Sequence, residues 1–287
     1  MKKTTPEEGT RPSLLEPGQT FGVIGTGIMG CTILKGLLNA GAFTPDQAWG
    51  VARSRSTCEE ASRELGVSVA REAGDRVATA GVIVLSVKPT QAVQALSTLR
   101  DSGLRPDTLL VSILAGTTLQ QLESLLGTAN PWVRAMPNTP CAIACGMTVL
   151  ALGSRAGAPH LALARRIFEP LGRVLELEEK HMDTVTGLSA SGPAFVYVMI
   201  EALADGGVAR GLPRLVAIEM AAQMVYGAAS MVLRSGRHPA ALKDDVTTPA
   251  GCTIAGILAL EDGRIRSVLS RAVEVASLRA GELGGGR

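Results

Sequence analysis

Aromatic side chains, histidine and an excess of either charge are all scarce in this chain of 287 residues. Only 3% of its residues are aromatic, and only three are histidines. The 28 Lys and Arg residues nearly balance the 26 Asp and Glu residues, and the net charge of +2 argues against a broad basic surface for nucleic acid. Gly, Ala, Val, Leu and Met abound instead, so we expect helices that pack closely through small side chains.

The sequence also lacks the runs that direct a chain to a membrane or across it. No apolar run reaches the length needed to cross a bilayer, so we expect no membrane partner. Residues 1–19 carry a basic pair followed by acids and prolines, without the apolar core of a signal peptide. We therefore expect a disordered lead-in and a cytoplasmic protein.

Neither the histidines nor the cysteines are spaced as metal ligands. We expect each histidine to be a surface or capping residue, at His160, His181 and His238. The cysteines form no C-x-x-C pair, and their odd number favours small buried residues in a reducing compartment. They are Cys31, Cys58, Cys141, Cys145 and Cys252. We expect no metal site.

What the chain does have is a glycine turn, within the stretch FGVIGTGIMG at residues 21–30. A short apolar run is followed at once by Gly25, Gly27 and Gly30, and then by a helical apolar stripe that stops near Gly41. The first glycine permits a tight turn, the second lets a pyrophosphate approach the backbone, and the third lets the helix lie close on the strand. The pattern in this context favours a dinucleotide site at a helix N-terminus over a merely structural turn.

The choice of dinucleotide is read at the end of the next expected strand. An acid about twenty residues past the glycines would hold the ribose 2′-hydroxyl of NAD, but the chain has Arg53, Ser54 and Arg55 there and no acid before Glu59. Arginine suits a 2′-phosphate because its planar fork binds two phosphate oxygens. NADPH is therefore predicted, with NADH as a weaker alternative. A solvated basic loop is the competing interpretation.

Apolar runs alternate with helical patterns through the first part of the chain, as in a doubly wound α/β sheet. The expected strands after the first are 48–52, 82–87, 109–113, 132–136, 147–152 and 173–177. Beyond about Lys180 the pattern becomes helical. We predict an N-terminal Rossmann-type domain over residues 19–180 and an all-helical domain over residues 181–287. The second domain would bind substrate. It would also dimerise, because its Ala- and Met-rich helices carry more apolar surface than one copy can cover.

Ligands of such sheets lie at the carboxyl ends of the strands, so the loops after the strands should line one crevice. Lys88 ends a strand there. Contact with cofactor or substrate and a solvated strand-end lysine are both open for it. The stretch Gly187 to Ser191 comes within one residue of a G-x-S-x-G nucleophile elbow, but it follows no strand, and a helix-capping role is favoured.

The loop from Asp244 to Thr253, DDVTTPAGCT, is the most unusual stretch after the glycine turn. Small residues before a helix leave N–H groups exposed beside hydroxyl side chains, which suits a small carboxylate. By composition alone it is equally compatible with an ordinary turn between helices.

Five motifs in order carry a family resemblance that covers about residues 21–283. They are GTGIMG at residues 25–30, VKP at 87–89, RAMPNTP at 134–140, TGLSASGP at 186–193 and the loop DDVTTPAGCT. The chain resembles pyrroline-5-carboxylate reductases. The resemblance implies NAD(P)H-dependent reduction of 1-pyrroline-5-carboxylate to L-proline, the last step of proline biosynthesis. It also implies a helical domain that interleaves in a homodimer, often assembled further into a decamer.

Carried over onto this chain, the resemblance implies a substrate site and a cofactor site. The substrate carboxylate would be held by Thr248, Ala250, Gly251, Cys252 and Thr253, with Thr253 as the catalytic residue near the ring nitrogen. The resemblance puts the nicotinamide beside Lys88, Pro89, Ala115, Pro137 and Asn138. With the glycine turn and the arginine turn, the predicted cofactor residues are Gly25, Thr26, Gly27, Ile28, Met29, Arg53, Ser54, Arg55, Val87, Lys88, Pro89, Ala115, Pro137 and Asn138. Ala250 departs from the family, which usually has glycine there, and a positive φ at this position would cost about 1 kcal/mol.

Two alternatives stay open at this stage. A β-hydroxyacid dehydrogenase shares this style of glycine turn, but it needs a lysine on the first long helix of its second domain, and residues 192–210 contain none. A non-catalytic NADPH-binding sensor would bind the dinucleotide without turning over any imine.

Overall fold

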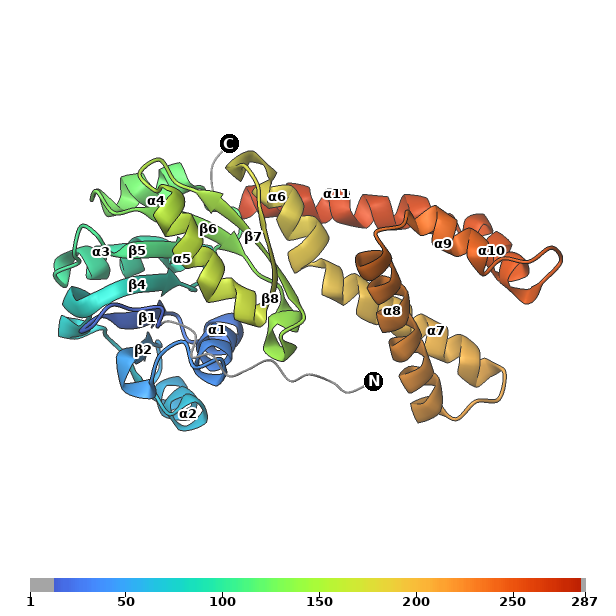
Figure 1. Cartoon of the computed structure of the whole chain (residues 1–287), viewed down its shortest axis with the longest axis horizontal. Coiled ribbons are helices and arrows are strands. Elements are labelled where there is room, and N and C mark those ends of the chain that lie inside the picture. Colours follow the sequence, from blue (N-terminus) through green and yellow to red (C-terminus); the bar gives the residue numbers. More distant parts are fainter. Residues whose placement is uncertain (1–12, 285–287) are drawn as a thin grey trace. The chain divides into compact units, whose positions relative to one another are not determined.

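The structure is a computed structural model that describes residues 13–284 (Figure 1). It divides into two compact units. Unit 1 runs to Ala190 and takes in the chain again from Ala276, and unit 2 is Ser191–Val275. Most of the expected lead-in, residues 1–12, lies outside the described residues. The expectation is wrong for the rest of it, because Leu14 and Leu15 are buried in the core of unit 1.

Unit 1 is built on an eight-stranded sheet in the order β3-β2-β1-β4-β5-β6-β7-β8 (Figure 1). The strands are β1 (Thr20–Ile24), β2 (Ala48–Val51), β3 (Ser68–Ala70), β4 (Ala80–Leu85), β5 (Leu109–Ser112), β6 (Trp132–Met136), β7 (Gly146–Leu152) and β8 (Gly172–Glu176). The first six run parallel in the order typical of Rossmann folds. β7 pairs antiparallel with β6, and β8 follows β7 in parallel. The predicted fold class is confirmed.

Helices cover both faces of this sheet. α1 (Ile28–Asn39), α2 (Arg55–Leu65) and α5 (Ala158–Phe168) contribute to the core on one face, and α3 (Ala92–Asp101) and α4 (Leu119–Leu126) to the core on the other. The packing of β4 on both faces explains why its sequence is apolar throughout. Val82 and Val84 enter the first core, Ile83 and Leu85 enter the second, and all four are buried.

Local sequence signals account for both ends of α4. Thr118 and Gln121 form a reciprocal capping box at α4, with the Gln121 amide donating to Thr118 Oγ1 at 3.2 Å and the Thr118 amide donating to Gln121 Oε1 at 2.8 Å. Gly127 closes the same helix in the left-handed conformation. The sequence did not predict β3, because it has three residues and none of them is fully buried.

Unit 1 continues past the sheet into short turns. η6 (Glu179–His181) and α6 (Met182–Val185) lead into η7 (Thr186–Ala190), a π-helical turn. This segment follows a helix, so it is no nucleophile elbow. Ser191 is the N-cap residue of α7, as the capping prediction had it, but its side chain makes no hydrogen bond to the helix.

The last turns of α11 (Ile265–Leu283) also belong to unit 1. Ala280 is buried there, and Gln121 Nε2 donates to the carbonyl oxygen of Gly284 at 3.2 Å. The contact is so close that a Cβ atom added at Gly116 would overlap the carbonyl oxygen of Ala280. Residues 276–284 therefore close onto the loop that follows β5.

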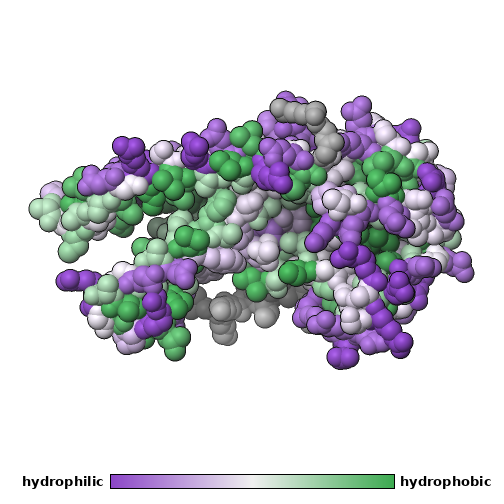
Figure 2. All heavy atoms as spheres, turned by 180° about the vertical axis from the view of Figure 1, so that it is seen from behind, coloured by the Kyte–Doolittle hydropathy of each residue, from purple (hydrophilic) through white to green (hydrophobic). Residues whose placement is uncertain are grey.

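Unit 2 contains α7 (Gly192–Ala209), α8 (Arg214–Ser235), α9 (Pro239–Asp245), α10 (Cys252–Asp262) and the first part of α11. α7 packs against α8, and Gly236 closes α8 with a left-handed φ of 65°. The buried residues of this unit are three alanines, Ala204, Ala217 and Ala221. Figure 2 shows hydrophobic side chains exposed along these helices.

The expectation that no segment could cross a bilayer is wrong by length and composition. Two helical stretches, Glu179–Ala209 and Arg214–Ser235, are long and apolar enough. Alanine, valine and methionine raise the average hydropathy, and the stretches still carry charges such as Glu201 and Glu219 in their interiors. Such apolar, exposed helices also fit a surface that a second copy of the chain covers.

Candidate active site

The glycine turn joins β1 to α1 and leaves an open place for a phosphate. Gly25 has a φ of 102°, and a Cβ atom there would lie 2.5 Å from the carbonyl oxygen of Ser86. At Gly30 a Cβ atom would overlap the carbonyl oxygen of Gly25, so both positions need glycine. At Gly27 an added Cβ would meet no atom within 4 Å, which marks open space beside the start of the helix.

The N-terminus of α1 has the electrostatics of an anion site. Gly27 caps it without a side-chain hydrogen bond, and its first turn contains no acidic residue. The first N–H groups are therefore free to bind an anion, and the helix dipole favours negative charge there. The open space at Gly27 and these free donors fit the pyrophosphate of a dinucleotide.

The arginine and serine turn lies at the end of the neighbouring strand. Ser54 caps α2, with its Oγ accepting from the Thr57 amide at 3.1 Å. Arg53 and Arg55 are both exposed, and Arg55 Nε lies 2.8 Å from Glu59 Oε1. The two guanidinium groups can reach solvent at the edge of the sheet where a 2′-phosphate is expected.

Four predicted cofactor residues lie on the loops after β4 and β5. Lys88 is exposed and forms no ion pair within residues 13–284, and its amide donates to Gln91 Oε1 at 3.4 Å. Pro89 begins the turn η3 (Pro89–Gln91), and Val87 is half-buried beside the second core. Ala115, on the next loop, packs against the small hydrophobic cluster that contains Met136. The structure thus brings these residues to the same carboxyl edge of the sheet as the glycine turn.

Asn138 is the best-fixed polar residue at this edge. Its Oδ1 accepts from the Met147 amide at 2.9 Å, and its Nδ2 donates to the carbonyl oxygen of Ser189 at 3.2 Å. These two bonds orient the side-chain amide and join the end of β6 to η7. Pro137, which precedes it, is buried.

Sequence reasoning gave no role to Arg134, which lies in the middle of β6. Its side chain is only 2% exposed, and it is paired with Glu179 at 3.3 Å and Asp183 at 3.4 Å. Glu179 Oε1 also accepts from the Leu119 amide at 2.6 Å. A buried arginine needs such partners, since burying an unpaired charge is costly. The available signal was a lone charge within the apolar run WVRAM.

The cysteines and histidines follow the predictions in part. Cys58 and Cys141 are buried, and burial raises the pKa of the Cys141 thiol. The expectation of burial is wrong for Cys145 and Cys252, which are exposed in a loop and in the first turn of α10. His160 and His238 accept from the amides of Gly157 and Ala240 at 3.0 and 3.2 Å, as capping residues do. No cluster of metal-ligating side chains occurs between Ser13 and Gly284.

The predicted substrate loop, taken by itself, lies in unit 2 before α10. Gly251 caps that helix without a side-chain hydrogen bond, and the first turn has no acidic residue. Its amide donates to the Thr248 carbonyl oxygen at 3.1 Å, and a Cβ atom on Gly251 would overlap Thr248 Oγ1. Cys252 and Thr253 are exposed. A second helix thus presents free N–H groups behind a glycine, which suits a carboxylate.

Ala250 has a φ of 55°, in the left-handed region that favours glycine. The departure from the family pattern at this position therefore carries backbone strain.

An ion pair spans α9, just before this loop. Arg237 precedes the helix, and its Nη1 donates to Oδ2 of Asp245, the last residue of the helix, at 2.6 Å. This hydrogen bond lowers the pKa of Asp245.

The fold and the glycine turn define a dinucleotide-dependent oxidoreductase with a Rossmann-type sheet. Family models agree with this. Residues 20–116 match the family "NADP oxidoreductase coenzyme F420-dependent", and residues 179–283 match "Pyrroline-5-carboxylate reductase dimerisation".

Curated relatives and solved structures match over nearly the whole chain. The chain is 40% identical to pyrroline-5-carboxylate reductase of Arabidopsis thaliana, over 93% of this chain and 97% of the relative. The Escherichia coli enzyme of that name is 38% identical over 88% and 94%. The structure of a pyrroline-5-carboxylate reductase from Coxiella burnetii gives a TM-score of 0.84 at 31% identity, covering 94% of this chain and 100% of that one. The chain belongs to the pyrroline-5-carboxylate reductase family.

Two further solved structures show how structural similarity falls with sequence identity. The Plasmodium falciparum pyrroline carboxylate reductase with NADP bound gives a TM-score of 0.83 at 29% identity, covering 93% of this chain and 98% of that one. A 3-hydroxyisobutyrate dehydrogenase from Salmonella typhimurium gives 0.55 at 15% identity, covering 90% and 93%, which shows a shared fold alone.

Proposed function

We propose that the chain reduces 1-pyrroline-5-carboxylate to L-proline, the last step of proline biosynthesis, with NADPH preferred over NADH. The observation that carries this proposal is a pair of uncapped helix N-termini, each preceded by a glycine and each without an acid in its first turn. Such termini bind anions. One suits the pyrophosphate of the cofactor, and the other suits the carboxylate of the imino acid.

The cofactor residues divide into three groups by the part of the cofactor that each would hold. Gly25, Thr26, Gly27, Ile28 and Met29 would hold the pyrophosphate, and Arg53, Ser54 and Arg55 would hold the 2′-phosphate through charge and hydroxyl groups. The nicotinamide end would lie against Val87, Lys88, Pro89, Ala115, Pro137 and Asn138. The bound cofactor supplies the hydride that reduces the imine carbon.

The substrate residues have a simpler task, because a protonated imine carbon is already electrophilic. Thr248, Ala250, Gly251 and Cys252 would hold the carboxylate through backbone N–H groups and a hydroxyl. As hydride adds to the carbon, the C=N electron pair becomes a lone pair on the ring nitrogen, and Thr253 would donate a hydrogen bond to that lone pair. Orientation and exclusion of water then account for most of what the protein contributes, and no strong general acid is needed.

The first test is the reaction itself. Purified protein is mixed with 1-pyrroline-5-carboxylate and either NADPH or NADH, while coenzyme absorbance is followed and proline is detected as product. We expect turnover with both coenzymes and a higher kcat/KM with NADPH. Bound NADPH without turnover of the imine would contradict the proposed reaction and leave a nucleotide-binding sensor.

The role of Thr253 is tested by Thr253→Ala. We expect kcat to fall by about 10-fold, because one hydrogen bond at the reacting nitrogen is lost. NADPH affinity should stay within about twofold. Thr247→Ala is the matched control, since that hydroxyl donates to the Lys243 carbonyl oxygen at 2.7 Å and is given no part in the reaction. Unchanged turnover in Thr253→Ala would remove the residue from the mechanism.

As functional divisions, we propose residues 19–180 for nucleotide binding and residues 181–287 for substrate binding and dimerisation. The matched dimerisation family indicates a homodimer. We extend this to a decamer built from dimers and to action in the cytoplasm. Light scattering during size-exclusion chromatography measures the mass of the assembly, and a dimer alone would rule out the decamer.

A further inference from the structure

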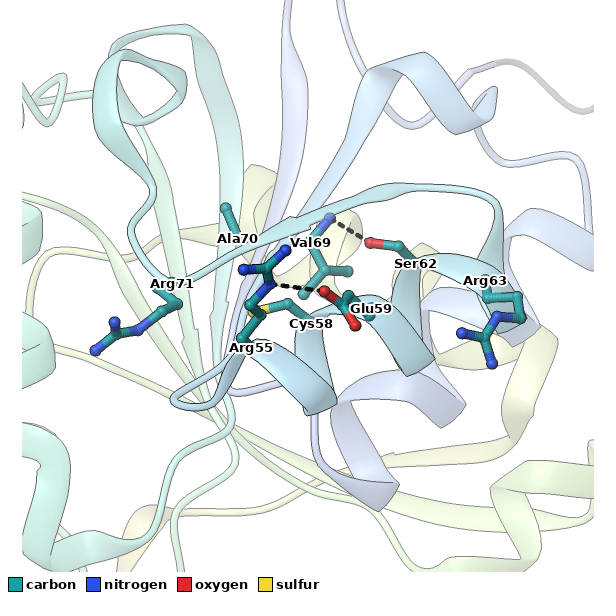
Figure 3. Close-up of a pocket in the computed structure, with 8 residues that line it drawn as sticks. All are labelled: Arg55, Cys58, Glu59, Ser62, Arg63, Val69, Ala70 and Arg71. Atoms are coloured by element: carbon teal, nitrogen blue, oxygen red, sulfur yellow. Dashed lines mark hydrogen bonds and ion pairs between the residues drawn. The ribbon is translucent and has the colours of Figure 1, made fainter.

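Three arginines line one open cavity at the edge of unit 1. The cavity has a volume of about 570 Å³ and lies between α2 and β3. Figure 3 shows Arg55 and Arg71 toward the start of α2 and Arg63 toward its other end. Two of the three are therefore at the end of α2 that faces the nucleotide edge of the sheet.

Strand register places Arg71 in line with the nucleotide turn. The amides of Gly25 and Thr26 donate to the Val51 carbonyl oxygen at 2.9 and 3.0 Å, and the Ala52 amide donates to the Ala70 carbonyl oxygen at 3.0 Å. Arg53 and Arg71 are the next residues along their strands. Two strand spacings, about 10 Å, separate β1 from β3, which is the direction in which the adenosine half of a dinucleotide extends from the glycine turn.

Arg55 and Arg71 are not equally available to bind a phosphate. Arg55 is paired with Glu59 at 2.8 Å. Arg71 is exposed and forms no ion pair or side-chain hydrogen bond in the part of the chain that the structure describes, and Figure 3 draws it without a partner. A bound phosphate must compete with Glu59 for the guanidinium of Arg55. Among the described residues, the guanidinium of Arg71 has no such competing carboxylate.

We propose that Arg71 is a third arginine for the 2′-phosphate of NADPH and that it acts with Arg53 and Arg55 to set the coenzyme preference. This rests on the cofactor named in the proposed function. A guanidinium offers paired donors to phosphate oxygens, and NADH lacks that phosphate, so Arg71 discriminates between the two coenzymes without touching the nicotinamide.

The test measures binding alone, by isothermal titration calorimetry with NADPH, NADH and adenosine 2′,5′-bisphosphate, without any imine. In Arg71→Ala we expect the Kd of NADPH and of the bisphosphate to rise by about 10-fold. The Kd of NADH should stay within about twofold. Arg63→Ala removes the same charge from the same cavity at the far end of α2, and it should change neither coenzyme by more than about twofold.

Two more variants sharpen the result. Arg71→Lys should recover part of the NADPH affinity, because it restores the charge without the planar fork. Glu59→Gln should tighten NADPH by about threefold, because it releases Arg55 from its ion pair. An equal loss for NADPH and NADH in Arg71→Ala, or no loss for either, would overturn the proposal. Selective NADPH binding without imine turnover would leave it standing and overturn the reaction instead.

Discussion

The two units bury their apolar side chains to very different degrees. In unit 1, large residues such as Phe21, Leu34 and Trp132 are fully buried against two faces of a sheet. In unit 2 the buried residues are three alanines, while Met220 and Met224 of α8 are half exposed or more. Burial of apolar surface drives folding, so unit 1 has its own core, whereas unit 2 leaves apolar surface exposed that a second copy would cover, as its match to a dimerisation family indicates.

The comparison can be measured because the fluorescent residues divide between the units. The two tryptophans, Trp49 and Trp132, both lie in unit 1, and the two tyrosines, Tyr197 and Tyr226, both lie in unit 2. Tryptophan emission thus reports on unit 1. Protein concentration supplies the second variable, since only a unit completed by association should gain stability with concentration.

The largest effect is expected from Leu34→Ala in unit 1. Leu34 is fully buried, and its truncation should lower the free energy of unfolding by about 2–5 kcal/mol, because it leaves a cavity in the core. Urea unfolding followed by tryptophan emission measures this, and the midpoint shift should not depend on protein concentration.

Lys35→Ala is the control for Leu34→Ala, on the exposed side of the same helix. Its side chain is 55% exposed and pairs with Glu64, and such surface pairs contribute little, so the midpoint should hardly move. A shift in Leu34→Ala that varies with protein concentration would show that unit 1 also depends on association.

The next effect is expected from Met224→Glu in unit 2. Met220, Met224 and Met231 lie along one side of α8 and are 50–56% exposed. A charge among them should raise the dimer dissociation constant by about 30-fold, which is roughly 2 kcal/mol. Sedimentation velocity over a dilution series measures this. Val93→Glu, at a 62% exposed valine of unit 1, is the matched control and should leave the dimer intact.

The smallest effects are expected from relieving the same strain in both units. Ala144 in unit 1 and Ala250 in unit 2 have φ values of 56° and 55°. Glycine at either position should raise the free energy of unfolding by about 0.5–1 kcal/mol, because it removes the clash of Cβ in a left-handed residue. Thermal unfolding measures both. Ala250→Gly should in addition lower the KM for the imino acid, and an unchanged KM would separate the strain from the carboxylate site.

Sequence patterns predicted the parts of the fold that depend on local chemistry. The run VIVLSV gave β4 within two residues, because a strand buried on both faces is apolar throughout. Thr118 and Gln121 have the spacing of a capping box at the start of α4, and Gly236 is the glycine expected just after α8, so both helix ends are readable from local sequence. The glycine turn was also readable, since each glycine meets a steric need that can be stated in advance.

The rest depends on contacts between distant residues. β3 is too short to have a pattern of its own and is found only through its pairing with β2, so Arg71 went unnoticed with it. Arg134 needed Glu179 and Asp183, about fifty residues away, before its burial made sense. Leu14 and Leu15 lie in a stretch without a helical or strand pattern, and only their contacts with distant residues of the core show that they are buried.

The return of α11 to unit 1 bears on how the protein is made. A chain emerges from the ribosome from its N-terminus, and domains generally fold as units while it does so. Here the residues that close onto Gly116 and Gln121 are synthesised after all of unit 2. Unit 1 must therefore wait, with the loop after β5 uncovered, until the whole helical segment has been translated. A nascent chain stalled before Ala276 would already contain every strand of the sheet and still lack the segment that completes it.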